Sequence, residues 1–211
     1  MHAKSKTHTN LALFDFDGTL CQVDSFTKFL FFALPKIEIC KKGLKILPWI
    51  SAYYLKAYPA NLMRPKLFST LFKAQSQDKI EIVAKKYAKI LLEKYLNPEL
   101  YNQLKLHQKQ GDEIVLVSAS IDIYLKYICK ELGIHLICTT TEIQSNHYTG
   151  QYISPDCSNE QKKIRVLEQY QLDQYQAVYA YGNSEEDLDL LSLADFPYLT
   201  TEQKPLPLLN N

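Results

Sequence analysis

The sequence lacks several features that would assign it to a specialised class of protein. Its 211 residues carry a formal net charge of only +1, so bulk electrostatics give no reason to expect nucleic-acid binding. No two of its five cysteines are spaced as in a Cys-x-x-Cys motif, so neither a disulfide framework nor a zinc cluster is expected. Free thiols favour a reducing compartment. Hydrophobic residues at 46% and charged residues at 22% are typical of a globular chain.

Long hydrophobic runs are also absent. The apolar stretch that follows the polar N-terminal residues stops after four positions, at Asp15, which is too short for the core of a signal peptide. The longest uncharged apolar-rich run, residues 46–55, falls far short of the ~18–20 residues of a membrane-spanning helix. We therefore expect a soluble, cytoplasmic protein that at most touches a membrane surface.

Short buried-strand patterns alternate with helical patterns over much of the chain. The strand patterns cover residues 11–16, 112–118, 134–139 and 176–181, and the helical patterns cover residues 121–133, 158–171 and 185–194. This alternation predicts an α/β fold with a Rossmann-like parallel sheet and helices on both faces. A further stretch around residues 148–153 suggests a hairpin excursion from the sheet.

The region from residue 23 to residue 99 has a different character. It contains no buried-strand pattern, and its apolar residues recur at spacings of three and four, as in a helix. We predict an all-helical cap over residues 23–99, inserted into a discontinuous core made of residues 11–22 and 100–200. Residues 1–10 and 201–211 are expected to be flexible tails.

The most informative motif is Asp15-Phe16-Asp17-Gly18-Thr19, directly after the first predicted strand. Alternation along a strand end places both carboxylates on one side. Two acids this close are costly to ionise together unless a cation neutralises them, and oxygen ligands favour Mg²⁺. Gly18 allows a sharp turn and a close approach of the backbone to a ligand. The alternative is a capped Asp-Gly turn without chemistry.

Three further segments have polar side chains at strand ends or helix starts, where parallel sheets bind ligands. Ser118 could donate to a phosphate oxygen, although the neighbouring Ser120 could simply cap a helix. Lys162 and Lys163 open a helix, where the helix dipole disfavours cations unless one of them faces a bound anion. Alternatively, they belong to a solvated face.

The fourth segment, residues 182–187, follows the last predicted strand and offers side-chain oxygens from Asn183 and Asp187. Helix capping by this loop is the alternative interpretation. In order and placement, the motifs DFDGTL, VLVSAS, HYTGQY and GNSEEDLDLL resemble those of the haloacid dehalogenase superfamily, and within it the branch that includes phosphoserine phosphatase. The resemblance covers roughly residues 11–20 and 112–200.

The resemblance implies a Mg²⁺-dependent phosphatase. Asp15 would be the nucleophile that carries the phosphoryl group, and Asp17 would be the general acid and base. Mg²⁺ would be held by Asp15, by the Asp17 backbone carbonyl, and by Asn183 or Asp187.

The resemblance also assigns a phosphate site. It implies that the phosphoryl oxygens contact Ser118, the Gly18-Thr19 turn and a lysine. Spacing from Cys157 favours Lys162 as this lysine, whereas the pattern KIRVL favours Lys163, and we predict Lys163. The superfamily usually has Asp where this chain has Asn183, which removes one negative charge from the metal site.

The substrate is expected to be a small phosphorylated metabolite or a lipid phosphate. Asp24 and Arg64 are candidate specificity residues for a phosphoserine-like substrate. The predicted cap is rich in aromatic residues and lysines, as in a helical mini-core or a surface that reaches a bilayer. It is similar to bacterial phosphatidylglycerophosphate phosphatases in its apolar character. A catalytically weak phosphate-binding module and a phosphotransferase are the alternative functions, and the sequence predicts no oligomeric state.

Overall fold

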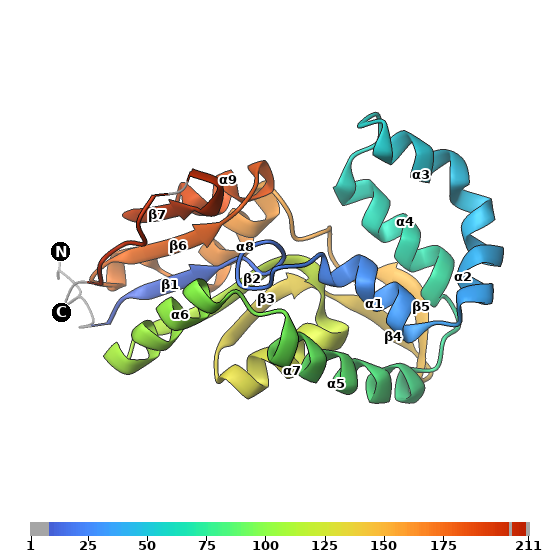
Figure 1. Cartoon of the computed structure of the whole chain (residues 1–211), viewed down its shortest axis with the longest axis horizontal. Coiled ribbons are helices and arrows are strands. Elements are labelled where there is room, and N and C mark those ends of the chain that lie inside the picture. Colours follow the sequence, from blue (N-terminus) through green and yellow to red (C-terminus); the bar gives the residue numbers. More distant parts are fainter. Residues whose placement is uncertain (1–8, 203, 210–211) are drawn as a thin grey trace.

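The computed structural model describes residues 9–202 and 204–209. Its main sheet has five parallel strands in the order β3-β2-β1-β6-β7, and helices cover both of its faces (Figure 1). The strands of this sheet are β1 (Leu11–Phe14), β2 (Glu113–Ile121), β3 (His135–Thr139), β6 (Val178–Gly182) and β7 (Phe196–Leu199). The predicted α/β fold with a Rossmann-like parallel sheet is confirmed.

The helices follow the predicted order. They are α1 (Ser25–Ala33), α2 (Lys36–Gly43), α3 (Leu47–Tyr54), α4 (Ala60–Phe72), α5 (Gln77–Lys94), α6 (Pro98–Gln110), α7 (Asp122–Leu132), α8 (Glu160–Gln169) and α9 (Leu188–Leu191). Short 3₁₀ turns are η1 (Leu44–Ile46), η2 (Leu172–Gln174), η3 (Glu185–Asp187) and η4 (Thr200–Glu202).

The central strand β1 is buried along its whole length. Its side chains alternate between two hydrophobic clusters, one on each face of the sheet. Ala12 and Phe14 belong to the cluster formed with α1, α5, α6 and α7, while Leu11 and Leu13 belong to the cluster formed with α8 and α9. This explains why the strand reads as a continuous apolar run rather than as an alternating one.

Between β1 and α6 the described chain forms helices and contributes no strand to either sheet. Helix α5 packs on α1 and α7, whereas α2, α3 and α4 lie at the outer end of the molecule (Figure 1). Two neighbouring segments join this helical part to the sheet: the amide of Gln22 donates to the carbonyl of Tyr95 at 2.8 Å, and that of Asn97 to that of Leu20 at 2.9 Å. The division into a core and a cap at residues 23–99 stays a prediction.

The hairpin excursion is formed by β4 (Thr141–Gln144) and β5 (His147–Tyr152), which pair antiparallel. Its two turn residues, Ser145 and Asn146, have φ angles of 48° and 62°. Positive φ at both positions is the mark of a type I′ turn, whose twist matches that of the strands. Strand β5 of the hairpin packs against α4, so the hairpin contacts the helical part of the chain (Figure 1).

The structure differs from the sequence-based expectations at both ends of the described chain. The strand β7 was missed, because Pro197 interrupts a run of only four residues; an edge strand tolerates this proline. The predicted tails include residues 1–8, 203 and 210–211, which lie outside the described residues. Within the predicted tails, Leu206 and Leu209 pack against the core and Asn10 is buried. The flexibility of the tails stays a prediction.

In the part of the chain that the structure describes, no helix combines the length and the apolar character needed to cross a bilayer.

Candidate active site

The first acid of the Asp15–Thr19 motif lies at the carboxyl edge of the sheet. Strand β1 ends at Phe14, and the amide of Asp15 donates to the carbonyl of Tyr181 at 2.9 Å, which extends the ladder to β6 by one residue. The Asp15 carboxyl is buried, and its Oδ2 accepts a hydrogen bond of 2.8 Å from Thr19 Oγ1. Gly18, with φ of 79°, then turns the chain back toward the sheet edge.

A buried lysine joins two acids from different strand ends. Nζ of Lys162 lies 2.6 Å from Asp15 Oδ1 and 2.5 Å from Asp187 Oδ1, and the Lys162 residue is only 2% exposed. A fully desolvated ammonium needs such partners, because an unpaired charge in this environment is very costly. The three side chains therefore form one charged cluster at the carboxyl edge of the sheet.

The prediction of Lys163 as the site lysine is wrong for this geometry. Nζ of Lys163 donates to Ser192 Oγ at 3.2 Å, away from both acids. Helix α8 turns its Lys162–Val166 face toward the sheet, and Val166 is buried, whereas Leu167, four positions after Lys163, is 49% exposed. The pattern KIRVL fits either face of a helix, so the sequence alone pointed to the wrong neighbour.

The loop after β6 is organised around Asp187. Its Oδ2 accepts hydrogen bonds from the amides of Asn183, at 2.9 Å, and Ser184, at 3.1 Å. This capping box is the helix-capping alternative considered for the segment, and it exists together with the contact to Lys162. The Asp187 carboxylate therefore both caps the helical turn after β6 and belongs to the charged cluster.

The residues expected to bind a metal ion lie close together. The Asn183 side-chain amide donates to Asp187 Oδ2 at 3.2 Å and to the Asp17 backbone oxygen at 3.1 Å. With this amide turned over, Asn183 would offer an oxygen beside these two, and hard oxygen ligands suit Mg²⁺. Metal binding by these residues stays a prediction.

The second acid, Asp17, is held apart from the charged cluster. Its Oδ2 accepts from Ser120 Oγ at 2.5 Å and its Oδ1 from the amide of Ser25 at 2.7 Å. The Ser25 hydroxyl in turn lies 2.7 Å from the Tyr124 hydroxyl. We expected Ser120 only as an alternative helix cap, and its role beside Asp17 was missed. The repeated serine in the motif VLVSAS was the available signal.

Of the remaining predicted phosphate-site residues, Ser118 lines the pocket and Gly18 and Thr19 do not. Ser118 is buried at the end of the straight part of β2, just before the ladder to β3 shifts register, and it lines the pocket together with Asp15 and Lys162. Thr19 is fully buried and faces Asp15 rather than the pocket. Gly18 lies in the turn whose open side is filled by the Asn183 amide.

The two candidate specificity residues differ in their placement. Asp24 caps α1, since its Oδ1 accepts from the amide of Thr27 at 2.9 Å. Arg64 on α4 makes a bidentate pair with Asp156, at 2.8 and 2.9 Å, and a further contact of 3.1 Å with Glu186. Both acids lie outside the helical part, so Arg64 ties α4 to the sheet side of the pocket. Neither partner of Arg64 was predicted.

Burial dominates the protonation of Asp15 and Asp17. It raises the pKa of Asp15 to about 7, and the ammonium of Lys162 offsets part of the rise. Burial likewise raises the pKa of Asp17, against the opposing hydrogen bonds from Ser120 and Ser25. Burial also acts to raise the pKa of Asp187, but Lys162 and the amides of Asn183 and Ser184 together lower it below its usual range. A further positive charge beside Asp15 would favour its carboxylate form.

Gly18→Ala tests how tightly this loop is packed. A Cβ at Gly18 would lie 2.1 Å from Asn183 Nδ2, and the residue would have to keep a φ of 79°. We expect a loss of at least about 2 kcal/mol in unfolding free energy, together with loss of the Asn183 position. Thermal unfolding measures the effect.

Gly43→Ala is the matched control for this prediction. A Cβ at Gly43 meets nothing within 4 Å, and its backbone is helical. We expect this change to be neutral or to stabilise by up to about 1 kcal/mol. Equal losses in both variants would contradict the close approach at Gly18.

The comparison with protein families agrees with the fold and the site. The chain belongs to the haloacid dehalogenase-like hydrolases, whose family model matches residues 12–192. The matched region includes the acids of the site, Ser118, Lys162 and the Asn183–Asp187 loop. The predicted relationship to this superfamily is thereby confirmed.

Two curated proteins with similar sequences cover most of this chain. The chain is 28% identical over 188 residues to Protein CicA of Caulobacter vibrioides, covering 88% of this chain and 83% of CicA. It is 28% identical over 203 residues to a histidinol-phosphatase of Neisseria meningitidis serogroup C, covering 89% of this chain and 88% of that protein. The family match thus shows a haloacid dehalogenase-like hydrolase, and the second relative is a phosphatase by name.

Solved structures share the fold. A Bordetella pertussis protein of unknown function superposes with a TM-score of 0.71 at 21% identity, over 89% of this chain and 88% of that one. A phosphoserine phosphatase with bound substrate superposes with a TM-score of 0.60 at 19% identity, over 92% of this chain and 84% of that one.

Proposed function

We propose that this chain hydrolyses phosphomonoesters with the help of Mg²⁺ through a phosphoryl group carried on Asp15. The observation that supports this most is the buried cluster of Asp15, Lys162 and Asp187 at the carboxyl edge of β1. A structural ion pair would need one acid for one lysine. The second acid, the acceptor oxygens around Asn183 and the separate Asp17 are explained together by phosphoryl transfer.

The first step is attack by the Asp15 carboxylate on phosphorus. The bond from phosphorus to the leaving oxygen breaks, and Asp17 donates its proton to that oxygen. The raised pKa of Asp17 suits this task, because a protonated acid is needed at the start. Lys162 and Ser118 would donate to the phosphoryl oxygens as negative charge develops.

The second step returns the enzyme to its starting state. A water molecule attacks the phosphorus of the acyl phosphate, Asp17 accepts the proton from this water, and the Asp15 carboxylate leaves. The hydrogen bonds from Ser120 and Ser25 favour the charged form of Asp17 that results from the first step. One residue thus serves as acid and then as base.

The metal ion would be held by Asp15, by the Asp17 backbone carbonyl, and by Asn183 or Asp187. It supplies a positive charge that neutralises the phosphoryl oxygens and favours the carboxylate form of Asp15. Lys162 Nζ would then face the phosphoryl group as well as the acids.

Trapping a phosphoryl mimic tests the proposal directly. A crystal soaked with beryllium fluoride and Mg²⁺ should show a BeF₃⁻ group whose beryllium is bonded to an Asp15 carboxyl oxygen, and the metal ion beside Asn183 and Asp187. A BeF₃⁻ group or a metal ion bound elsewhere would contradict the assignment. Such a result, with no Mg²⁺-dependent turnover of an aryl phosphate, would favour a phosphate-binding module instead.

Asn183→Asp should strengthen the metal site. The change adds a negative charge beside Asp187 Oδ2 and the Asp17 carbonyl. We expect the Mg²⁺ concentration for half-maximal turnover of p-nitrophenyl phosphate to fall by about tenfold, because hard cations gain from each added carboxylate. Without metal, repulsion among the acids should lower the melting temperature relative to the parent protein.

The matched control for this prediction is Asn159→Asp. Asn159 precedes Glu160 at the start of α8 and is not among the residues that line the pocket with Asp15. Its Mg²⁺ dependence should equal that of the parent protein. A tenfold change in the control, or none in Asn183→Asp, would argue against a metal ion at this position.

A further inference from the structure

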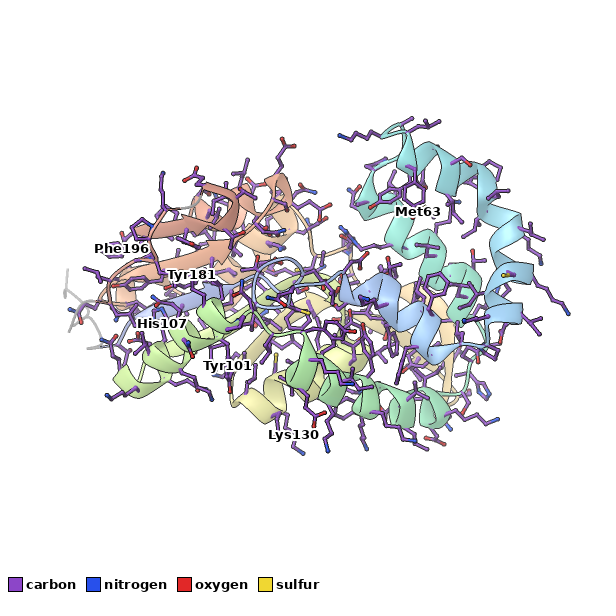
Figure 2. The ribbon with its side chains drawn as sticks, in the orientation of Figure 1. Met63, Tyr101, His107, Lys130, Tyr181 and Phe196 are labelled. Atoms are coloured by element: carbon purple, nitrogen blue, oxygen red, sulfur yellow. The ribbon has the colours of Figure 1, made fainter. Side chains whose placement is uncertain are left out.

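The pocket above the proposed catalytic acids has a polar floor and mostly apolar walls. Its volume is about 280 Å³, and its floor is formed by the acids, Ser118 and Lys162. The walls come from the helical part, where Met63 lies on the inner side of α4 (Figure 2). The apolar wall residues include Leu30, Ile39, Ile50, Met63, Leu67 and Leu71. A bound phosphoryl group would therefore have its organic part among aliphatic side chains.

The described lining of the pocket has no spare cation for a negatively charged organic part. Among the described lining residues, the lysines and arginines are Lys162 and Arg64. Lys162 faces the phosphoryl end, and Arg64 is paired with Asp156 and Glu186. A substrate carboxylate would have to displace one of these ion pairs, which is costly at a side chain as buried as Asp156. Apolar substrates face no such cost.

The apolar walls continue onto an exposed surface. We call the outward side of α2, η1 and α3 the α2–α3 face; it lies at the outer end of the molecule (Figure 1). Tyr54 both lines the pocket and is 77% exposed. The large exposed apolar residues of the face are Ile37, Leu44, Leu47, Trp49, Tyr53, Tyr54 and Leu55. Such a group at the mouth of a pocket marks an interaction site rather than scattered surface residues.

The charge on this face selects the kind of partner. Residues 36–56 contain five lysines and one glutamate, a net charge of +4. The glutamate, Glu38, is already paired with Lys42 at 2.7 Å. Two copies of the face would repel each other, whereas an anionic bilayer attracts clustered lysines and accepts aromatic and aliphatic side chains at its boundary.

We propose that the α2–α3 face docks on anionic bilayers and that the pocket takes a phosphomonoester with an apolar organic part directly from the lipid. This inference rests on the proposed function for its chemistry, but the docking step does not depend on turnover. When the α2–α3 face is bound to a bilayer, the mouth of the pocket lies at the bilayer surface. The phosphate and the chain of a lipid can then enter the pocket together.

The pocket is tested with a series of soluble n-alkyl phosphates from ethyl to octyl. We expect kcat/KM to rise by roughly fourfold per methylene until the pocket is filled, because each buried methylene adds transfer free energy. Phosphoserine, whose carboxylate finds no free cation, should fall below the longer members of the series. A flat series, or a preference for phosphoserine, overturns the apolar substrate class.

The docking face is tested by co-sedimentation with vesicles of phosphatidylcholine alone or mixed with phosphatidylglycerol. We expect at least about tenfold stronger binding to the anionic vesicles, weakened by 0.5 M salt. Leu44→Ser with Leu55→Ser, and separately Lys41→Gln with Lys45→Gln, should reduce this binding at least tenfold. Neither pair contributes to the pocket lining.

Matched controls carry the same changes on other surfaces. They are Ile82→Ser with Ile153→Ser, which are 58% and 67% exposed, and Lys109→Gln with Lys130→Gln on α6 and α7. Lys130 lies on the side of the molecule away from α3 (Figure 2). These controls should bind as the parent protein does. Equal losses in test and control pairs overturn the face assignment.

Two results separate this inference from the proposed function. Vesicle binding by Asp15→Asn, without turnover of any substrate by the parent protein, keeps the docking face and refutes the function. Turnover of p-nitrophenyl phosphate without anionic vesicle binding keeps the function and refutes the docking. A dimer that Leu44→Ser with Leu55→Ser dissolves, in the absence of vesicle binding, also refutes it in favour of a protein interface.

Discussion

Lys162→Met is expected to cost both stability and activity, whereas Lys163→Met is expected to cost neither. The ammonium of Lys162 is the partner of two buried carboxylates, so its removal leaves Asp15 and Asp187 facing each other without a counter-charge. Breaking a buried pair in this way typically lowers the unfolding free energy by about 3–5 kcal/mol. The turnover of p-nitrophenyl phosphate should fall by at least about 100-fold, as for loss of an oxyanion-hole donor.

The neighbouring lysine makes this a sharp comparison. Lys163 has the same chemistry one position along α8, but its Nζ contacts Ser192 at the outer surface. Its change to methionine should stay within about 0.5 kcal/mol of the parent protein. Chemical unfolding measures the change in stability of both variants, and steady-state kinetics measure the change in their turnover. Similar losses in the two, or a larger loss in Lys163→Met, would contradict the geometry of the charged cluster.

Added Mg²⁺ refines the test. A divalent cation near Asp15 and Asp187 would restore part of the missing positive charge in Lys162→Met. The variant should therefore gain more in melting temperature from Mg²⁺ than the parent protein does. Its activity should stay low at any Mg²⁺ concentration, because the metal ion does not supply the donor that Lys162 provides.

Asp15→Asn should abolish turnover without unfolding the protein. The amide is nearly isosteric with the carboxylate but is not a nucleophile toward phosphorus, so kcat on p-nitrophenyl phosphate should fall by at least about 1000-fold. Lys162 keeps Asp187 as its partner. Because burial raises the pKa of Asp15 to about 7 and part of that rise comes from repulsion by Asp187, loss of its charge should not lower stability near neutral pH.

The control for this prediction is Asp189→Asn. Asp189 lies in the first turn of α9, two residues after Asp187, and outside the pocket lining. It should keep the activity of the parent protein. Measurable, Mg²⁺-dependent turnover in Asp15→Asn close to that of the control would exclude Asp15 as the residue that carries the phosphoryl group.

Several site residues could be predicted because they follow strands in the sequence. Strand ends of a parallel sheet meet at one edge, so Asp15, Ser118 and Asn183 were brought together by periodicity alone, before any contact was known. The resemblance of the DFDGTL motif to its family added the prediction that Asp15 is the nucleophile and Asp17 the general acid and base. Local order along the chain was enough for these residues because the sheet converts it into spatial proximity.

The choice between Lys162 and Lys163 could not be made in the same way. Neighbouring residues on a helix point about 100° apart, so the choice depends on how α8 is rotated against the sheet. That rotation is set by tertiary packing, in which Val166 is buried and Leu167 is not. Both are apolar, and a single sequence does not distinguish them.

Contacts between distant segments escaped prediction for a similar reason. Arg64 and Asp156 are 92 residues apart, and no periodic pattern connects them. Ser120 was interpreted as a helix cap because serines before helices usually are caps, yet its hydroxyl is bonded to Asp17. Strand β7 was missed because a proline within four residues outweighs the apolar signal.

The central place of β1 has a consequence for biosynthesis. Both of its ladder partners, β2 and β6, are translated later than β1, about 100 and 165 residues further along the chain. Asp15 thus cannot take its final position until β6 has been translated. A nascent chain that stops before β6 would carry every residue of the DFDGTL motif, yet Asp15 would lack the backbone partner that Tyr181 provides.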